Sequence, residues 1–254
     1  MKIDIIIPTY KGLQNVKCVL ESVFNQSYKN FRVILVDNCS SDGTVEFVKN
    51  EFKDVILIEN TSNLGFSKAV NLGINFSLNS DCSELILLLN NDVELLPDFL
   101  EKGVKTFSEI KNADFVAVKM MNYFNRELID DTGDFIRKSG GTPMARGHGE
   151  IDKGQYDHSE FIFGACAGAA FYKSELFRTA GVFDEDFFAY LEDVDLSFRF
   201  QLYGFKCYYN HEIVCFHKRR ETTNKFEGWE TFYNERNLVS LRIKNYPFIL
   251  YLKY

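Results

Sequence analysis

The sequence predicts an α/β protein with a mostly parallel central sheet flanked by helices. Its first strand-like run, residues 3–7, is apolar except for Asp4 and ends at Pro8, as in a strand that is covered on both faces. Further strand-like runs alternate with segments of helical period, which is typical of right-handed βαβ units. Polar residues follow the strand ends directly, where open α/β sheets bind their ligands.

The expected elements alternate through the first 90 residues. After the first strand, four apolar residues recur at helical spacing and predict a helix: Leu13, Val16, Leu20 and Val23. The order continues with a strand at 31–36, a helix at 44–52, a strand at 55–58, a helix at 67–78 and a strand at 85–89. We therefore expect residues 1–120 to form a half of nucleotide-binding style.

The second half is less regular. From 121 to 160 glycine and polar residues replace the apolar periodicity, and we predict a mobile loop there. Beyond it we expect a small-residue stretch at 161–171, a helix at 191–203, strands at 206–209 and 213–216, and a helix at 229–243. The chain shows no internal repeat, and we predict a single domain over residues 1–254.

Composition excludes several classes of protein. With a net charge of −7, the chain is a poor general binder of nucleic acid, which requires clustered Lys and Arg. Its six cysteines form no CxxC pair and predict free thiols in a reducing, cytoplasmic compartment. No stretch approaches 18 apolar residues, so we expect no membrane span. The aromatic, Lys-bearing end at 245–254 predicts at most peripheral contact with the inner face of the cell membrane.

An acidic cluster, Glu192, Asp193 and Asp195, lies in an otherwise apolar and aromatic stretch. A helix over 191–203 would place four apolar residues on one buried stripe: Leu191, Val194, Phe198 and Leu202. Asp195 can pair with Arg199 four residues later, whereas Asp193 has no cation on its own helix and is free to accept a proton. The alternative is that all three carboxylates only favour a helix start. A catalytic base is the more specific hypothesis.

Two strand ends predict a nucleoside site. Pro8, Thr9 and Tyr10 follow the first strand and offer a hydroxyl and a ring face. Asp37 follows the second strand and can accept the N3–H of uracil or thymine, which favours a pyrimidine nucleotide. Asp37 also begins a turn-rich loop, so turn formation is its competing explanation.

A third strand end predicts a metal and diphosphate site. Asn90, Asn91 and Asp92 follow five apolar residues, and Asp92 is the expected ligand of Mg²⁺ or Mn²⁺ bridging a diphosphate. His217, at the end of a later strand, is a possible second ligand, since imidazole suits Mn²⁺. The alternatives are a turn at 90–92 and a structural histidine.

Two further segments could meet an anion. Asn63, Gly65 and Lys68 lie at a predicted helix start, where backbone N–H groups and a lysine can bind phosphate. A basic run at 218–220 follows His217 and could also bind phosphate. A solvated loop is an equally consistent explanation of this run. The sequence has no GxGxxG after its first strand, no P-loop and no GxSxG, which argues against dinucleotide oxidoreductases, P-loop enzymes and α/β-hydrolases.

Taken in order, these motifs resemble those of family 2 glycosyltransferases of the GT-A fold, and most closely rhamnosyltransferase-like members. The matching segments are IIIPTY (5–10), VDNCSSDGT (36–44), NLGF (63–66), NNDV (90–93), GVFDEDFFAYLEDVDLSFR (181–199), His217 and ERN (235–237). Each is short, but their order and spacing are specific and cover essentially the whole chain.

The resemblance implies an inverting transfer of a sugar, with rhamnose expected, from a dTDP- or UDP-sugar to a hydroxyl of a surface-glycan or lipid-linked acceptor. Asp193 would be the base, and Glu192 would orient the acceptor or share that role. Residues 161–254 would form the acceptor and catalytic half, with these residues near the sugars: Gly164, Ala165, Cys166, Asp195 and Trp229.

The sequence departs from the family at three places. Asn-Asn-Asp stands at the family's DxD position, Lys68 stands where a small residue is frequent, and the basic run at 218–220 is unusual. Two alternatives stay open: a nucleotidylyltransferase, which would need a Gly- and Arg-rich loop after the first strand, and a non-catalytic nucleotide- or glycan-binding module.

Overall fold

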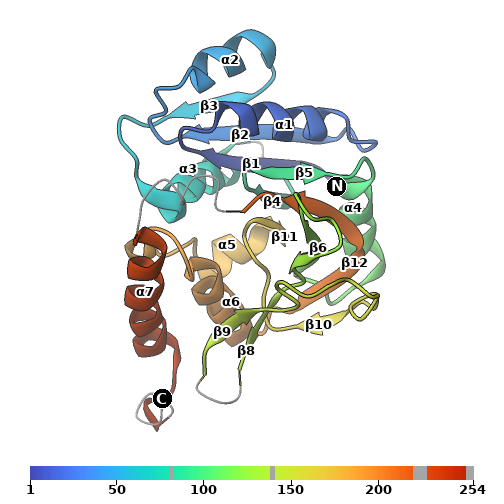
Figure 1. The fold of residues 1–254 in the computed structure, drawn as a ribbon, viewed down its shortest axis with the longest axis vertical. Helices are drawn as coiled ribbons and strands as arrows, with labels where there is room; N and C mark the ends of the chain where they lie inside the picture. Colours follow the sequence, from blue (N-terminus) through green and yellow to red (C-terminus); the bar gives the residue numbers. More distant parts are fainter. Residues whose placement is uncertain (81–82, 138–140, 220–227, 250–254) are drawn as a thin grey trace.

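The computed structural model describes residues 1–80, 83–137, 141–219 and 228–249. Its centre is a mostly parallel sheet of order β10-β12-β6-β11-β4-β1-β2-β3 (Figure 1). The strands of this path are β1 (Ile3–Thr9), β2 (Phe31–Asp37), β3 (Ile56–Glu59), β4 (Leu85–Leu89), β6 (Phe115–Asn122), β10 (Glu160–Ile162), β11 (Ala169–Lys173) and β12 (Cys207–His217). The predicted α/β class and central sheet are confirmed.

The first four strands run parallel, as the alternating pattern predicted. β11 is the exception near the middle of the sheet, because it pairs antiparallel with both β4 and β6. β12 returns parallel to β6. Two short strands lie off this path: β5 (Val93–Leu95) pairs with β12, and β7 (Ile129–Asp131) pairs with β6.

Helices cover both faces of the sheet and bury two apolar cores. One core packs the side chains of Ile3, Ile5 and Ile7 against α1 (Leu13–Phe24), α2 (Thr44–Glu51) and α4 (Phe99–Glu109). The opposite core packs Ile6 against α3 (Gly65–Asn79), α5 (Ser174–Ala180) and α6 (Glu192–Leu202). The alternation of side chains along β1 thus supplies both cores. The last helix, α7 (Trp229–Asn245), lies beside α6.

The segment at 121–160 contains more regular structure than its composition predicted. Besides β7 it includes β8 (Asp134–Ile136) and β9 (Pro143–Ala145), which pair as a small antiparallel ribbon. Lys119 is buried and forms ion pairs with Asp152 (2.6 Å) and Asp157 (2.7 Å), which tie the later part of the segment to β6. Strands of three residues are too short to show a period of two, so the sequence pattern missed them.

Two other sequence predictions need correction. The strands expected at 206–209 and 213–216 form one strand, β12, whose register against β6 shifts between Asn210 and Val214. Leu202 is 78% exposed, because α6 buries a stripe through Leu196 and Phe200 rather than through Leu202. Phe200 packs in the aromatic core against Phe115, with ring centroids 5.3 Å apart.

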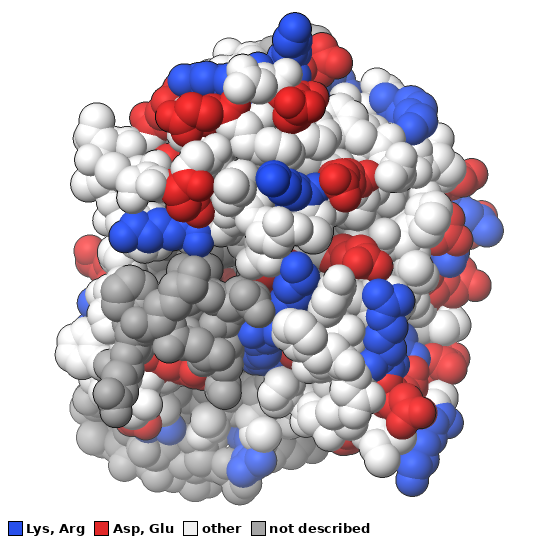
Figure 2. All heavy atoms as spheres, turned by 45° about the horizontal axis from the view of Figure 1, so that its top comes forward, with Lys and Arg blue, Asp and Glu red and all other residues white. Residues whose placement is uncertain are grey.

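The described surface carries mixed charge. On the face drawn in Figure 2, the described acidic and basic side chains alternate rather than gathering by sign, in keeping with the exclusion of a general nucleic-acid surface. Among the described helices, none has the length and apolar character needed to cross a membrane. The predicted membrane-contact end at 245–254 lies partly outside the described residues, as does Arg220 of the basic run.

Candidate active site

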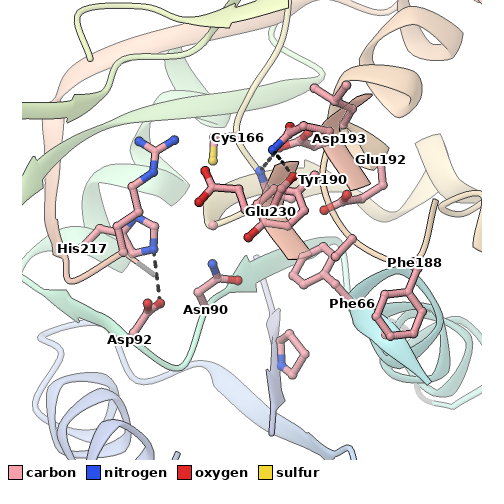
Figure 3. Close-up of a pocket in the computed structure, with 18 of the residues that line it drawn as sticks. Phe66, Asn90, Asp92, Cys166, Phe188, Tyr190, Glu192, Asp193, His217 and Glu230 are labelled. Carbon is pink, nitrogen blue, oxygen red and sulfur yellow. Dashed lines mark hydrogen bonds and ion pairs between the residues drawn. The ribbon is translucent and has the colours of Figure 1, made fainter. Parts of the chain in front are cut away.

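A pocket of about 400 Å³ opens at the carboxyl ends of β1 and β4, within the size range of small-molecule sites. Figure 3 shows Asp92 and His217 on one side, Glu192 and Asp193 on the other, and Asn90 and Cys166 between them. The sequence-predicted residues that line the pocket are Pro8, Thr9, Tyr10, Asn63, Gly65, Asn90, Asn91, Asp92, Cys166, Glu192, Asp193, His217 and Trp229.

Asp92 and His217 face each other at the ends of neighbouring strands. Asp92 Oδ1 lies 3.2 Å from His217 Nε2 (Figure 3), and His217 Nδ1 lies 2.7 Å from Asp130 Oδ2. Burial opposes a charge on the imidazole, but the two carboxylates outweigh burial and raise the pKa of His217 to about 10. A cation is therefore stabilised at this point of the pocket.

The same residues fit a divalent cation. An oxygen and an imidazole nitrogen are suitable donors, and a carboxylate bound to the other ring nitrogen, here Asp130, is typical of metal-bound histidine. The described residues contain no group of three or more His, Cys, Asp or Glu side chains arranged around one point. The protein would thus supply two ligands, Asp92 and His217, and phosphate oxygens and water would supply the others.

Asp130 also binds the guanidinium group of Arg219, which follows β12. Its Oδ1 accepts a hydrogen bond from Arg219 (2.9 Å), and His217 and Arg219 together keep the pKa of the Asp130 carboxyl low in spite of burial. Arg219 lines the pocket, whereas Lys218 donates to Asn15 on α1 (2.9 Å). Of the two described residues in the predicted basic run, only Arg219 reaches the pocket.

The nucleoside-side residues are close to one another. Asn91 Nδ2 donates to Thr9 Oγ1 (2.8 Å), which joins the ends of β1 and β4. Asp37 is 2% exposed; its Oδ2 accepts from the Ser40 amide (2.9 Å), while Oδ1 has no hydrogen-bond partner among the described residues. Asp37 lies behind the pocket wall, and Asn38 lines it.

The start of α3 is not a free anion site, which corrects one prediction. The Gly65 amide donates to Asn63 Oδ1 (3.0 Å), and the Phe66 and Ser67 amides both donate to the Phe188 carbonyl (2.6 and 3.2 Å). Lys68 does not line the pocket but pairs with Glu185 at 3.6 Å. The backbone donors are already used, so phosphate binding through them is not supported.

Gly65 is required by this contact. Its φ is +82°, and a Cβ on this residue would lie 2.5 Å from the Phe188 ring. Glycine alone combines the left-handed backbone with the absence of a side chain. The NLGF motif therefore has a packing role against the loop that precedes α6.

Asp193 lies at the start of α6 and is partly exposed to the pocket. Its Oδ2 accepts from the Ala167 amide (3.1 Å) and its Oδ1 from the Val194 amide (2.9 Å). Burial raises the pKa of Asp193 although these amides oppose the rise. The adjacent Glu192 is 6% exposed, its Oε2 has no partner among the described residues, and burial raises its pKa well above the usual value.

Three residues predicted near the sugars have structural roles instead. Asp195 is fully buried and binds Arg199 Nε (3.0 Å) and Lys244 Nζ (2.9 Å), so it stabilises the α6–α7 contact and does not line the pocket. A Cβ on Gly164 would lie 2.5 Å from Ser197 Oγ, and Ala165 is buried in the core. The following residues, 166–168, are the part of this run that reaches the pocket.

The loop before α6 is held in an unusual backbone conformation. Phe188, Tyr190 and Leu191 have φ values of +62°, +72° and +65°. Asn237 of α7, itself fully buried, donates from one Nδ2 to the carbonyls of Phe187 (2.9 Å), Ala189 (2.7 Å) and Tyr190 (2.7 Å). The ERN motif was the sequence signal, but its role could not be derived without the fold. We call residues 186–191 the base loop.

Sequence reasoning also missed the carboxylates of the 121–160 segment. Asp130, Asp131 and Asp134 all line the pocket, although this segment was expected to be a mobile loop. Burial raises the pKa of Asp131 to about 7 and that of Asp134 well above its usual value. The only signal available was the DDTGD pattern at 130–134, which reads first as a turn.

The pocket thus combines the carboxyl edge of a mostly parallel sheet, an Asp–His pair that suits a divalent cation, and a carboxylate at a helix start. The comparisons agree: residues 4–178 match the model of "Glycosyl transferase family 2", and the chain belongs to this family. Its fold is the GT-A fold.

Relatives with sequence similarity carry glycosyltransferase names. An uncharacterized glycosyltransferase of Rickettsia typhi is 28% identical over 84% of this chain, and the chain spans 62% of that relative's length. A Campylobacter jejuni relative, named GalNAc(5)-diNAcBac-PP-undecaprenol beta-1,3-glucosyltransferase, is 25% identical over 83% of this chain and 62% of its own.

Solved structures share the fold at lower identity. A mannosyltransferase of Pyrobaculum calidifontis in complex with GDP-Man and Mn²⁺ aligns with a TM-score of 0.66 at 17% identity. The alignment covers 96% of this chain and 63% of the mannosyltransferase. S. aureus TarS in complex with UDP-GlcNAc aligns with a TM-score of 0.65, 16% identity, and 97% and 68% coverage. These likenesses establish the fold.

Proposed function

We propose that this chain is an inverting glycosyltransferase that uses a nucleoside diphosphate sugar and Asp193 as its general base. The observation that carries the proposal is the separation of two sites across one pocket: Asp92 and His217 on one side, Asp193 on the other (Figure 3). An in-line displacement needs the leaving group and the base on opposite sides of the reacting carbon.

In the proposed reaction, Asp193 removes the proton of an acceptor hydroxyl as its oxygen attacks the anomeric carbon. The carbon–oxygen bond to the diphosphate breaks in the same step, and the nucleoside diphosphate leaves with the bonding pair. A bound Mg²⁺ or Mn²⁺ would neutralise charge on the departing diphosphate. Asp92 and His217 would hold that ion, Asp130 fixes the His217 ring, and Arg219 faces the same charge.

The environment of Asp193 suits a base. Its raised pKa makes the carboxylate a stronger proton acceptor than an exposed aspartate, while the Ala167 amide orients one oxygen. Glu192 is placed to orient the acceptor or to share the base role, since it lines the same side of the pocket. Trp229 offers an aromatic face for a sugar ring.

The finer assignments are part of this proposal. The donor is dTDP- or UDP-linked, with rhamnose as the expected sugar; Thr9 and Tyr10 line the nucleoside side of the pocket, and Asp37 lies behind its wall. The acceptor is a surface-glycan or lipid-linked hydroxyl, which the name of the Campylobacter relative supports. The protein would act on the cytoplasmic side, with peripheral membrane contact through its C-terminal end. We also propose that residues 1–254 form one domain, with a nucleotide-binding half (1–120), a connecting segment (121–160) that contains β7, β8 and β9, and an acceptor half (161–254).

The test combines binding and transfer. Thermal shift is measured with dTDP, UDP, GDP and CDP, with and without Mn²⁺, and transfer is then assayed with the preferred donor class. Asp193→Asn should abolish transfer and leave nucleotide affinity within about twofold, whereas Asp92→Ala should remove the Mn²⁺-dependent part of nucleotide binding. Asp98→Asn, a surface change at the start of α4, is the control. Wild-type turnover by Asp193→Asn would remove Asp193 as base, and failure of every nucleotide to bind would refute the proposed function.

A further inference from the structure

The pocket contains two buried carboxylates that the proposed displacement does not use. Asp131 ends β7 and Asp134 begins β8, on either side of the Thr132–Gly133 turn. Both line the pocket, although they are only 3% and 7% exposed. Charged side chains are rarely buried to this extent without a partner, so their presence at the pocket requires a reason.

The turn between them is built to bring both carboxyl groups to one place. Gly133 has a φ of +105°, and its amide donates to Asp131 Oδ1 at 2.5 Å. A Cβ on Gly133 would lie 2.1 Å from Ile162, so the reversal depends on glycine. The Asp134 amide donates to the Gly164 carbonyl (2.9 Å), which fixes the start of β8 beside the stretch that leads to Ala167.

Asp134 Oδ2 is the independent sign of a ligand. This oxygen is buried and has no hydrogen-bond partner among the described residues. The same holds for Glu192 Oε2, which belongs to α6 and lines the same pocket. Buried polar atoms are nearly always hydrogen-bonded, and leaving one unpaired costs roughly 1–3 kcal/mol. Two such atoms from separate elements at one pocket indicate donors that a bound molecule supplies.

The position of these carboxylates identifies the part of the donor they would meet. Asp131 follows Asp130, which binds His217 on the diphosphate side. Asp134 is bonded beside the stretch whose Ala167 amide holds Asp193. The turn therefore lies between the leaving-group side and the base side, where the transferred sugar must be during displacement. The phosphates carry no donor for these oxygens, whereas sugar hydroxyl groups do.

We propose that Asp131 and Asp134 form the subsite that binds hydroxyl groups of the transferred sugar. This inference rests on the proposed function and adds the residues that select the sugar. Asp134 accepts a hydroxyl proton through its unpaired Oδ2, and Asp131 binds a neighbouring hydroxyl through the oxygen that is not used by Gly133. Burial and the nearby Asp193 carboxylate also raise the pKa of Asp134, so the group can donate to a sugar oxygen as well as accept.

The test compares each nucleoside diphosphate with its nucleotide sugars, which differ from it only by the sugar. Calorimetry measures binding of UDP and dTDP, and of UDP-glucose, UDP-GlcNAc and dTDP-rhamnose, to the wild type and to Asp134→Asn, Asp134→Ala and Asp131→Asn. Asp157→Asn, which changes a carboxylate of the same segment outside the pocket, is the matched control. We expect the pocket variants to bind the preferred nucleotide sugar at least tenfold more weakly, with nucleoside diphosphate affinity changed less than twofold.

Retained nucleoside diphosphate binding also shows that each variant is folded. If the pocket variants bind the nucleotide sugar as tightly as the control does, or if no sugar adds affinity to its nucleoside diphosphate in the wild type, the sugar subsite is refuted while the proposed nucleotide site stands. If neither nucleoside diphosphate binds the wild type, the proposed function fails together with this inference.

Discussion

Asn237 is expected to keep the proposed base in position although it does not line the pocket. Replacing it with alanine removes three hydrogen bonds to the base loop, those to the carbonyls of Phe187, Ala189 and Tyr190. The Asn237 Nδ2 group has two N–H bonds, which these three carbonyls share, so at roughly 1 kcal/mol net for each N–H the clamp contributes about 2 kcal/mol. Three left-handed non-glycine residues cost about 1 kcal/mol or more each. Because this strain is at least as large as the contribution of the clamp, the loop should relax once the clamp is lost.

The assay separates this effect from simple destabilisation. In Asn237→Ala we expect hydrogen exchange of residues 186–191 to speed up, kcat to fall at least tenfold, and the Kd of the nucleoside diphosphate to stay within twofold. Ser240→Ala is the matched control, because Ser240 lies on the same helix and its hydroxyl donates to the Arg236 carbonyl (3.3 Å) of that helix. If exchange in the base loop and kcat both match the control, the clamp argument is wrong.

Three further changes follow from individual contacts. Gly65→Ala should lower the melting temperature by several degrees and speed exchange of the base loop, because it combines strain at φ +82° with a clash at Phe188; an unchanged melting curve would contradict this. Asp131 has a folded-state pKa of about 7 against a usual 3.8, so the protonated carboxyl stabilises the folded state fully below about pH 4, and this contribution is lost as the pH rises through 7. Asp131→Asn should therefore raise the ligand-free melting temperature at about pH 8 but not at about pH 4. An equal change at both pH values would refute this prediction. Asp195→Ala should cost about 3 kcal/mol in urea unfolding, because it leaves Arg199 and Lys244 without their buried partner, whereas a loss below about 1 kcal/mol would mean that the pair is replaceable.

Much of the fold was predictable because its pattern is local. The apolar run at 3–7 requires cover on both sides, and the alternation after it leaves few topologies other than a parallel sheet. From the sequence alone, the strand-end rule places Thr9, Asn91 and Asp92 at one edge of the sheet. Each of these inferences used residues that are close in sequence.

The errors concern relations between distant segments. The helical wheel separated Asp193 from Asp195 but could not show that Lys244, 49 positions further along the chain, joins the Asp195–Arg199 pair. The sequence predicted that the amides at the start of α3 were available to an anion, but two of them donate to the carbonyl of Phe188 from a later loop. Asp131 was hidden in a three-residue strand whose only local signal was a turn. Tertiary contacts decided all three cases.

The direction of β11 has a consequence for the pocket. A parallel strand ends at this edge of the sheet and presents its carbonyl end there, but β11 runs the other way, so its chain enters the sheet from the pocket. On this approach to β11, the Ala167 amide donates to an Asp193 oxygen. The reversed direction of β11 thus lets a backbone N–H, rather than a charged side chain, stabilise the Asp193 carboxylate. The direction of β11 and the position of the proposed base are therefore linked through the connection 163–168.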